Sequence, residues 1–469
     1  TFFKGNSSVN PEIIIMGGKI NDLMQIVSTS PSLNVGDYGI FILFKLPMEN
    51  KICADTDNKY LLTKGKNCYV LIEKDSCKIE TLEGSLVNDE KINCIEEITG
   101  KTIKYNKQEI MLKSTAANHS ISGFSPKEIT AGTGEVLRIF GSGFGNTQGT
   151  STVWFRYADN PNQIFTSSNG FKVSLWSDEE IQIVVPSKAA TGNIFVNIND
   201  VKAESTEELK VKFNVQQEYY KPQYLINTNE KGGYTFHFHS NINKFVGAKE
   251  QIEKSINEWI CSTSVPWEIG NSQSVEPGMD GICSVQFGDL SDGGGETLGR
   301  ASIILQETSF LNSNDYVLKE VDVIFSQKEN WCFNNSKITD QQIDFLSVAL
   351  HEFGHAHLLG HVNDVDDLMH YAITSGEIRD IGNNNVLCGK YILNQSILFK
   401  NEKFKTIQIR NTPTPAFSVK GDTLYSTNEF ITYQWFLNGE KIANSTNRRF
   451  VITQSGSYSL QITDNNSCV

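Results

Sequence analysis

The sequence has no hydrophobic run long enough to cross a membrane. The longest apolar stretch among its 469 residues, from Tyr38 to Leu46, is interrupted by Lys45 and has the length of a strand. A transmembrane helix needs about 18 or more apolar residues, so we expect no membrane span. The chain begins at Thr1 without a signal peptide, and we expect that a leader was removed or that the sequence is a fragment.

Positive charge is scarce as well. The chain carries 41 lysines and arginines against 54 aspartates and glutamates, which gives a formal net charge of -13. Because a phosphate backbone attracts a basic surface, this balance argues against a nucleic-acid partner. The acidic residues are spread along the chain, which indicates solubility rather than a charged binding site.

Cysteine pairs of the C-x-x-C type are absent, which argues against a cysteine zinc site or a thioredoxin-like motif. Eight of the nine cysteines form two sets of four, namely Cys53, Cys68, Cys77 and Cys94, and Cys261, Cys283, Cys332 and Cys388. We predict that each set pairs within itself in an oxidising compartment, which leaves Cys468 without a partner. The alternative is a cytosolic protein with buried free thiols.

The pattern of strands and helices predicts four parts, as expected for a chain too long for one core. Residues 1–118 show short strands between polar turns and predict an all-β domain of unknown type. Residues 119–214 contain regularly spaced strands, such as Val136–Phe140, and predict a β-sandwich. Residues 410–469 return to strands around Trp435 and stop where one more strand is expected, which suggests truncation.

Residues 215–402 mix helices with strands and predict an α+β domain. Apolar residues recur at three- and four-residue steps between Phe245 and Trp259, which is the spacing of a helix. A second helix is expected to begin at Thr339, where Gln342 completes a capping box, and to run into a histidine cluster. Strands are predicted at 232–239, 284–287, 301–306 and 321–325.

The segment HEFGHAHLLGH at 351–361 carries the chemistry. Residues four apart on a helix lie on one face, so His351 and His355 can present two imidazoles to one metal ion. Glu352 lies beside them and can reach a water on that metal. Zinc suits neutral imidazole, and a catalytic zinc site keeps three protein ligands and one open position.

The third ligand must come from beyond the helix. If the helix continued, His361 would lie about 15 Å along the axis from His351, so the helix must end soon after His355 and the chain must turn back. Gly360 is consistent with such a break. Asp364 is the alternative third ligand.

Two further side chains near the motif have no obvious catalytic task. Met369 follows the third histidine by eight residues, and a buried methionine there would form an apolar floor beneath the histidines. His357 lies roughly 240° around the helix from His351 and is expected to be structural.

Taken together, HEFGHAHLLGHVNDVDDLMHYA at 351–372 resembles the metzincin metalloproteases, with the histidine-to-methionine spacing of the matrixin branch. The resemblance implies proteolysis, one catalytic Zn2+, and an edge strand that aligns an extended peptide, for which Ala301–Gln306 is the candidate. The Met-His-Tyr triplet is similar to the astacin turn, so Tyr371 would stabilise an oxyanion or only shape the substrate pocket. The sequence departs from the matrixin pattern at Leu358, where the family has glycine, and no cysteine-bearing propeptide motif precedes the domain.

The flanking parts carry resemblances of their own. The motif at 121–145, with Gly141, Gly143 and Gly145, is similar to the opening of IPT/TIG immunoglobulin-like domains. The C-terminal part resembles immunoglobulin-like repeats of secreted bacterial surface proteins, especially those of Bacteroidetes. Both imply spacer or adhesive modules without catalytic residues. The expected fold class is multidomain, an α+β metzincin-like catalytic domain with all-β immunoglobulin-like sandwiches flanking it.

The sequence therefore predicts a secreted or outer-surface bacterial zinc endopeptidase in which Glu352 takes a proton from a zinc-bound water. Its partners would be protein or peptide substrates, with cell-surface or matrix components bound through the β domains. The alternative is a surface adhesin with a vestigial protease domain, although a structural zinc site would not need Glu352. Ca2+ is a further candidate cofactor, because the loop Asp289–Glu296 offers oxygen ligands from Asp289 and Asp292 among glycines; a plain flexible loop is the alternative.

Overall fold

A computed structural model describes most of the chain beyond residue 118. The described ranges are 119–165, 172–198, 201–217, 221–272, 276–290, 297–310, 313–334, 338–410, 415–464 and 468, with eight short strands before them. Those strands are β1 (Glu12–Ile14), β2 (Gly18–Ile20), β3 (Leu23–Val27), β4 (Gly39–Phe41), β5 (Leu43–Lys45), β6 (Lys59–Leu62), β7 (Tyr69–Ile72) and β8 (Ile79–Thr81). The first set of four cysteines lies outside the described residues.

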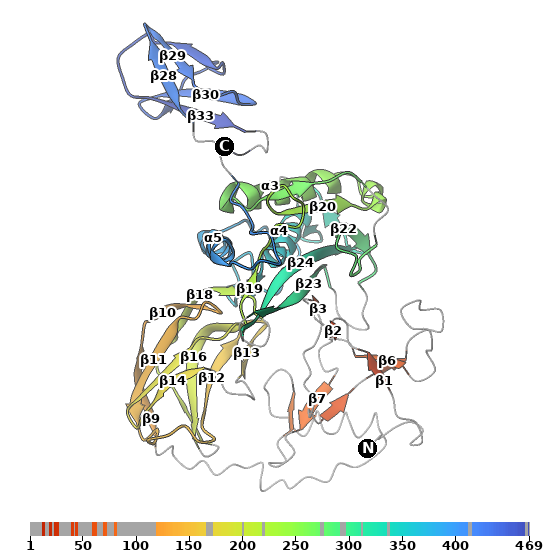
Figure 1. Ribbon diagram of the computed structural model, residues 1–469, viewed down its shortest axis with the longest axis vertical. Helices are drawn as coiled ribbons and strands as arrows, with labels where there is room; N and C mark the ends of the chain where they lie inside the picture. The colour runs from red at the N-terminus through yellow and green to blue at the C-terminus, as the bar shows by residue number, and fades with distance from the viewer. Residues whose placement is uncertain are drawn as a thin grey trace.

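Two four-stranded sheets enclose one apolar core between residues 119 and 215, at the lower left of Figure 1. Alternation explains the arrangement, because every second side chain of a strand such as β15 is buried. The strands of the two sheets are β9 (Ser120–Ser125), β11 (Val136–Ser142), β12 (Thr152–Tyr157), β13 (Asn160–Phe165), β14 (Val173–Trp176), β15 (Glu180–Val184), β16 (Ala189–Ile198) and β17 (Val201–Glu204). A third sheet of three strands pairs β10 (Glu128–Ala131) with β18 (Lys210–Val215), and β18 with β27 (Leu359–Gly360). We call this part the sandwich.

The central part is built on a mixed sheet with the order β21-β20-β22-β24-β23-β3-β2. Strands β20, β21, β22 and β24 run parallel, whereas β23 runs antiparallel to β24. The bounds are β19 (Gln223–Tyr224), β20 (Tyr234–Phe238), β21 (Trp267–Ile269), β22 (Cys283–Gly288), β23 (Gly299–Phe310), β24 (Ser313–Ser326), β25 (Trp331–Cys332), β26 (Ile343–Asp344) and β27 (Leu359–Gly360). Every strand predicted for this part is present.

The candidate substrate strand Ala301–Gln306 lies within β23, but its outer side is already paired. Residues 302–306 pair antiparallel with β3, in the register Ser302 with Val27 and Gln306 with Leu23. A segment from the first thirty residues therefore takes the place that an extended peptide would need.

Three α-helices pack with this sheet: α3 (Ala248–Thr263), α4 (Phe345–Ala356) and α5 (Asn383–Leu398), after a short 3-10 turn η1 (Ser240–Lys244). Helix α3 buries Ile252, Ile256 and Trp259, as the predicted periodicity requires. The rings of Phe236 on β20 and Phe353 on α4 meet edge to face at 5.1 Å. No helix in the described ranges is long and apolar enough to span a membrane.

Helix α4 begins six residues later than predicted. Asp344 is its N-cap, and its carboxylate accepts hydrogen bonds from N (2.8 Å) and Oγ (2.6 Å) of Ser347. The hydroxyl of Thr339 instead donates to Gln342 within a turn ahead of the helix. The buried cap formed by Asp344 and Ser347, and not the exposed Thr339–Gln342 pair, therefore marks the start of the helix.

The C-terminal part consists of two three-stranded sheets around the fully buried Trp435, at the top of Figure 1. Its strands are β28 (Phe417–Lys420), β29 (Thr423–Ser426), β30 (Thr432–Leu437), β31 (Glu440–Lys441), β32 (Arg449–Val451) and β33 (Tyr458–Thr463). Asn438 and Gly439, with φ of 51° and 86°, form the predicted turn between β30 and β31.

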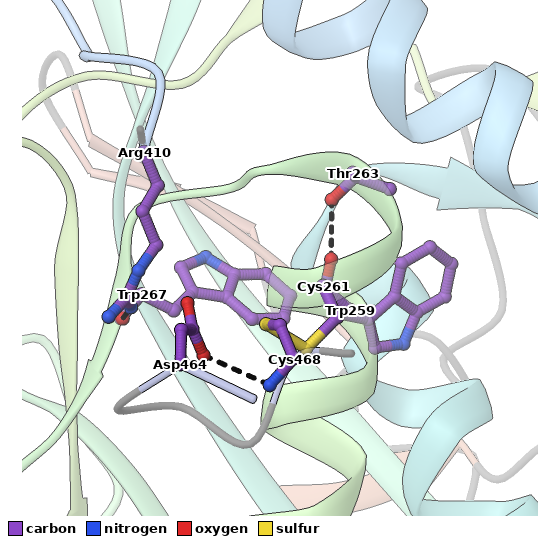
Figure 2. The surroundings of a disulfide bond; sticks show 7 residues. All are labelled: Trp259, Cys261, Thr263, Trp267, Arg410, Asp464 and Cys468. Atoms are coloured by element: carbon purple, nitrogen blue, oxygen red, sulfur yellow. Dashed lines mark hydrogen bonds between the residues drawn. A yellow bond between two sulfur atoms is a disulfide. The ribbon is translucent and has the colours of Figure 1, made fainter. Parts of the chain in front are cut away.

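The disulfide prediction for the second cysteine set is wrong. Cys261 on α3 bonds Cys468 near the chain end, 207 residues away, while Cys283, Cys332 and Cys388 are buried free thiols. Figure 2 shows this bridge beside Trp267, with the amide of Cys468 donating to Asp464 at 3.0 Å. Cys468 thus has a partner, and the bridge ties the C-terminal part to α3. Spacing along the chain misled the prediction because the pairing crosses a domain boundary.

Candidate metal centre and active site

A left-handed turn ends the histidine-bearing helix. Helix α4 stops at Ala356, and Leu358 has φ of 64° while its amide donates to the carbonyl of His355 at 2.8 Å. A non-glycine residue in this conformation costs on the order of 1 kcal/mol. The side chain of Leu358 is fully buried, and this apolar burial offsets the cost. The turn therefore works with leucine where the family pattern has glycine.

The turn brings three imidazoles together. Nε2 of His355 lies 3.1 Å from Nε2 of His351 and 3.0 Å from Nε2 of His361, and the latter two atoms are 3.2 Å apart. Among the described residues this is the only group of three or more histidine, cysteine or acidic side chains that could hold a metal ion. Asp364, the alternative third ligand, is not part of it.

The outer nitrogens of the two helical histidines face backbone carbonyls. Nδ1 of His351 lies 2.8 Å from the oxygen of Leu368, and Nδ1 of His355 lies 2.9 Å from that of Leu359. A carbonyl only accepts, so both Nδ1 atoms carry the hydrogen and both Nε2 atoms keep a lone pair. Burial, more than the neighbouring imidazoles, lowers the pKa of His351 well below its usual range, so this ring is neutral.

The third histidine is oriented by a carboxylate instead. Nδ1 of His361 lies 2.6 Å from Oδ1 of Asp159, a residue of the sandwich. Its Nε2 therefore also turns a lone pair towards the same point. Three lone pairs that face one another suit a cation, and ligands of tetrahedral zinc at about 2.0–2.1 Å from the metal lie roughly 3.3–3.4 Å apart. The donor set fits zinc.

Glu352 lies beside this centre and is 5% exposed. Its Oε2 is buried without a hydrogen-bond partner in the described part of the protein. Burial raises the pKa of this carboxyl to about 8, and the positive charge of Arg300 opposes that rise. Gly299 leaves room for it, because a β-carbon there would lie 2.7 Å from Cγ and Oε1 of Glu352.

A loop beneath the histidines carries Met369. Its side chain is 1% exposed and packs under α4, where a β-carbon on Gly354 would lie 2.4 Å from the methionine sulfur. The loop is closed by the amide of Val362, which donates to the carbonyl of Met369 at 3.0 Å. Met369 therefore lies in the packed core against α4.

A pocket of about 220 Å³ opens over the centre. Its wall includes the three histidines and Glu352, with Tyr371 at its rim, 41% exposed. The ring of Tyr371 lies against that of His370, with centroids 4.4 Å apart and planes tilted by 38°. Arg379 is buried in the same wall and donates to the carbonyl of Ala372 at 2.6 Å.

Four residues near the centre were not singled out from the sequence: Asp159, Gly299, Gly354 and Arg379. The need for glycine at positions 299 and 354 can be recognised only when the side chains that pack against them, Glu352 and Met369, are known. Asp159 lies 202 residues before His361, and no local pattern could have linked them. His357, as expected, points away; its Nε2 lies 3.1 Å from Oγ1 of Thr263 on α3.

The expected calcium loop gains no support. Residues 291–296 lie outside the described part of the chain. Asp289, at its start, forms an ion pair of 2.8 Å with Lys328.

Similarity to solved structures is weak. An auxiliary nutrient binding protein from Bacteroides thetaiotaomicron VPI-5482 is 22% identical over 24% of this chain and 25% of that chain, with a TM-score of 0.17. A protein of unknown function from the same organism is 12% identical over 26% of this chain and 34% of that one, with a TM-score of 0.18. The chain thus spans about a quarter to a third of these structures, and at such scores they support no conclusion.

No curated protein matches the chain. The family model Matrixin matches residues 233–384, which hold strands β20 to β27, helices α3 and α4, and all three histidines. Members of this family bind zinc and are metalloendopeptidases. The chain therefore contains a matrixin-like metalloprotease domain.

Proposed function

We propose that this chain is a secreted, zinc-dependent endopeptidase whose metal is held by His351, His355 and His361. The observation that carries the proposal is the convergence of three Nε2 lone pairs within 3.0–3.2 Å of one another, with a buried carboxylate beside them. The Matrixin match to residues 233–384 supports the same reading. When bound, zinc would lower the pKa of a water molecule and polarise the scissile carbonyl.

Glu352 acts as the general base. Its position beside the imidazoles lets Oε2 accept a proton from the attacking water and later donate it to the leaving amine. Burial raises the pKa of Glu352, which suits a group that must hold a proton during the reaction. Before the reaction, a dication bound beside it would favour the ionised carboxylate, which can accept that proton. A site that only bound metal for stability would not need this carboxylate.

The substrate is an extended peptide that adds to β23. Gly299, the first residue of β23, and Leu298 just before it line the same pocket as Glu352, so a strand paired with β23 leads to the reacting atoms. Such a peptide has to replace β3, which pairs with residues 302–306. Met369 supports the histidines from below, and Tyr371 contacts the substrate or the developing oxyanion from the rim.

The flanking parts are proposed to be an IPT/TIG-like sandwich and a C-terminal immunoglobulin-like domain of a bacterial surface protein. The bridge between Cys261 and Cys468 suits an oxidising compartment outside the cell. An adhesin with a vestigial protease domain remains the rival function.

Metal analysis combined with a casein digestion assay tests the proposal. We expect one zinc per chain, activity that is lost with a chelator and restored by zinc, and neither metal nor activity in the double variant His351→Ala/His355→Ala. Stoichiometric zinc in that variant would contradict the ligand assignment. A zinc-loaded parent that cleaves no protein or peptide would favour the adhesin.

A further inference from the structure

The third histidine is held by two different parts of the chain. The turn that delivers it, β27, pairs with β18 of the sandwich, and the amide of Gln216 donates to the carbonyl of Leu358 at 2.9 Å. Two residues beyond His361, the side-chain amide of Asn363 forms hydrogen bonds of 3.1 and 2.8 Å with the backbone of Thr191. The segment 358–363 is therefore docked on the sandwich along its whole length.

Asp159 reaches the centre from the turn between β12 and β13. Its side chain is 17% exposed and that of His361 is 13% exposed, so the contact between them is largely shielded from water. The hydroxyl of Tyr157 donates to Oδ2 of Asp159 at 2.6 Å, which leaves Oδ1 directed at His361. The amide of Ala158 donates to the carbonyl of Lys188 at 2.9 Å and fixes the turn.

A carboxylate on the outer nitrogen has a definite effect on a metal-binding imidazole. It keeps the hydrogen on Nδ1, holds the ring in one orientation and makes Nε2 a stronger donor. The outer nitrogens of the two helical histidines face backbone carbonyls of their own domain. The strongest acceptor of the set is thus supplied from outside the matrixin-like domain.

We infer that Asp159 is a positioning residue for the zinc site, so that the sandwich is part of the metal centre rather than a spacer. This inference rests on the proposed function, because it concerns how tightly His361 binds the proposed zinc. Removal of the carboxylate frees the His361 ring to rotate and to carry its hydrogen on Nε2, and both changes weaken metal binding.

The test is zinc affinity in the full-length protein, measured by competition with a chromogenic chelator. Asp159→Ala is expected to weaken zinc binding by about 10- to 100-fold. Asp159→Asn keeps the shape and an accepting oxygen but loses the charge, so a smaller loss is expected. Asn363→Ala is the matched control, because it removes two hydrogen bonds between the same segments and leaves the carboxylate in place.

Thermal melting of the metal-free proteins separates affinity from folding. If Asp159→Ala does not fold, the near-isosteric Asp159→Asn decides the question. Parent-like zinc affinity in every folded Asp159 variant would overturn the inference, as would an equal loss in Asn363→Ala. A parent protein that binds no zinc would overturn the proposed function and this inference with it.

Discussion

Gly299 offers a way to move Glu352 without altering a metal ligand. A methyl group at this position would lie 2.7 Å from Cγ and Oε1 of Glu352 and 2.9 Å from Cδ. Ordinary contact begins near 3.4 Å, so the carboxylate has to shift by about 0.7 Å. Nearly every residue of α4 is buried, whereas the Glu352 side chain borders the pocket, so the shift falls on the reacting oxygen rather than on the helix.

A misplacement of about 1 Å in a catalytic group costs on the order of 10²-fold in rate. We therefore expect Gly299→Ala to lower kcat on a peptide substrate by roughly 10- to 100-fold, with zinc content unchanged. Gly278→Ala is the control, since nothing lies within 4 Å of a β-carbon there. Melting temperature and zinc stoichiometry are measured alongside. A Gly299→Ala protein with the parent's kcat would refute the placement of Glu352 as the base.

Three other predictions follow from the same structure. Mass mapping without reduction should find Cys261 joined to Cys468 and free thiols at Cys283, Cys332 and Cys388; a bridge among the latter three would contradict the fold. The double variant Met24→Pro/Gln25→Pro should raise kcat/KM several-fold, because it weakens the pairing of β3 with β23 and so opens β23 to substrate. Two prolines are used because the amides of adjacent strand residues point to opposite sides, and one of them faces β23. An unchanged rate would show that β3 does not compete with substrate. Burial raises the pKa of Glu320 from 4.5 to about 8, so the folded state binds a proton more tightly than the unfolded state. The melting temperature should therefore fall as pH rises between those values, and Glu320→Gln should reduce this dependence. An unaltered dependence on pH would exclude Glu320 as its source.

The histidine motif could be predicted from sequence because its three residues lie close together in the chain. Spacing of four on a helix fixes His351 and His355, and the return of His361 follows from the need to end α4. What local reasoning could not supply was the packing that offsets the cost of a leucine at the left-handed turn. Leu358 adopts φ of 64° because its side chain is buried, a fact that depends on the completed core.

Long-range partners were beyond the reach of sequence patterns. The bridge of Cys261 and the contact of Asp159 span 207 and 202 residues, and neither has a local signature. Helix α5 was not predicted either, because its apolar residues do not form one face, since Leu387 and Leu398 are exposed, and Gly389 interrupts it. The glycine is there for packing: a β-carbon on it would lie 2.8 Å from Thr263 and 3.0 Å from His357.

The most direct test of the proposed chemistry is the hydrolysis rate of Glu352→Gln with its zinc content measured in the same preparation. Glutamine keeps the shape and one accepting oxygen but cannot take the proton. The account predicts a full complement of zinc, an unchanged fold and a rate lower by about 10²-fold or more, the scale of losing a positioned general base. A zinc-loaded Glu352→Gln protein that cleaves peptides as fast as the parent would contradict it.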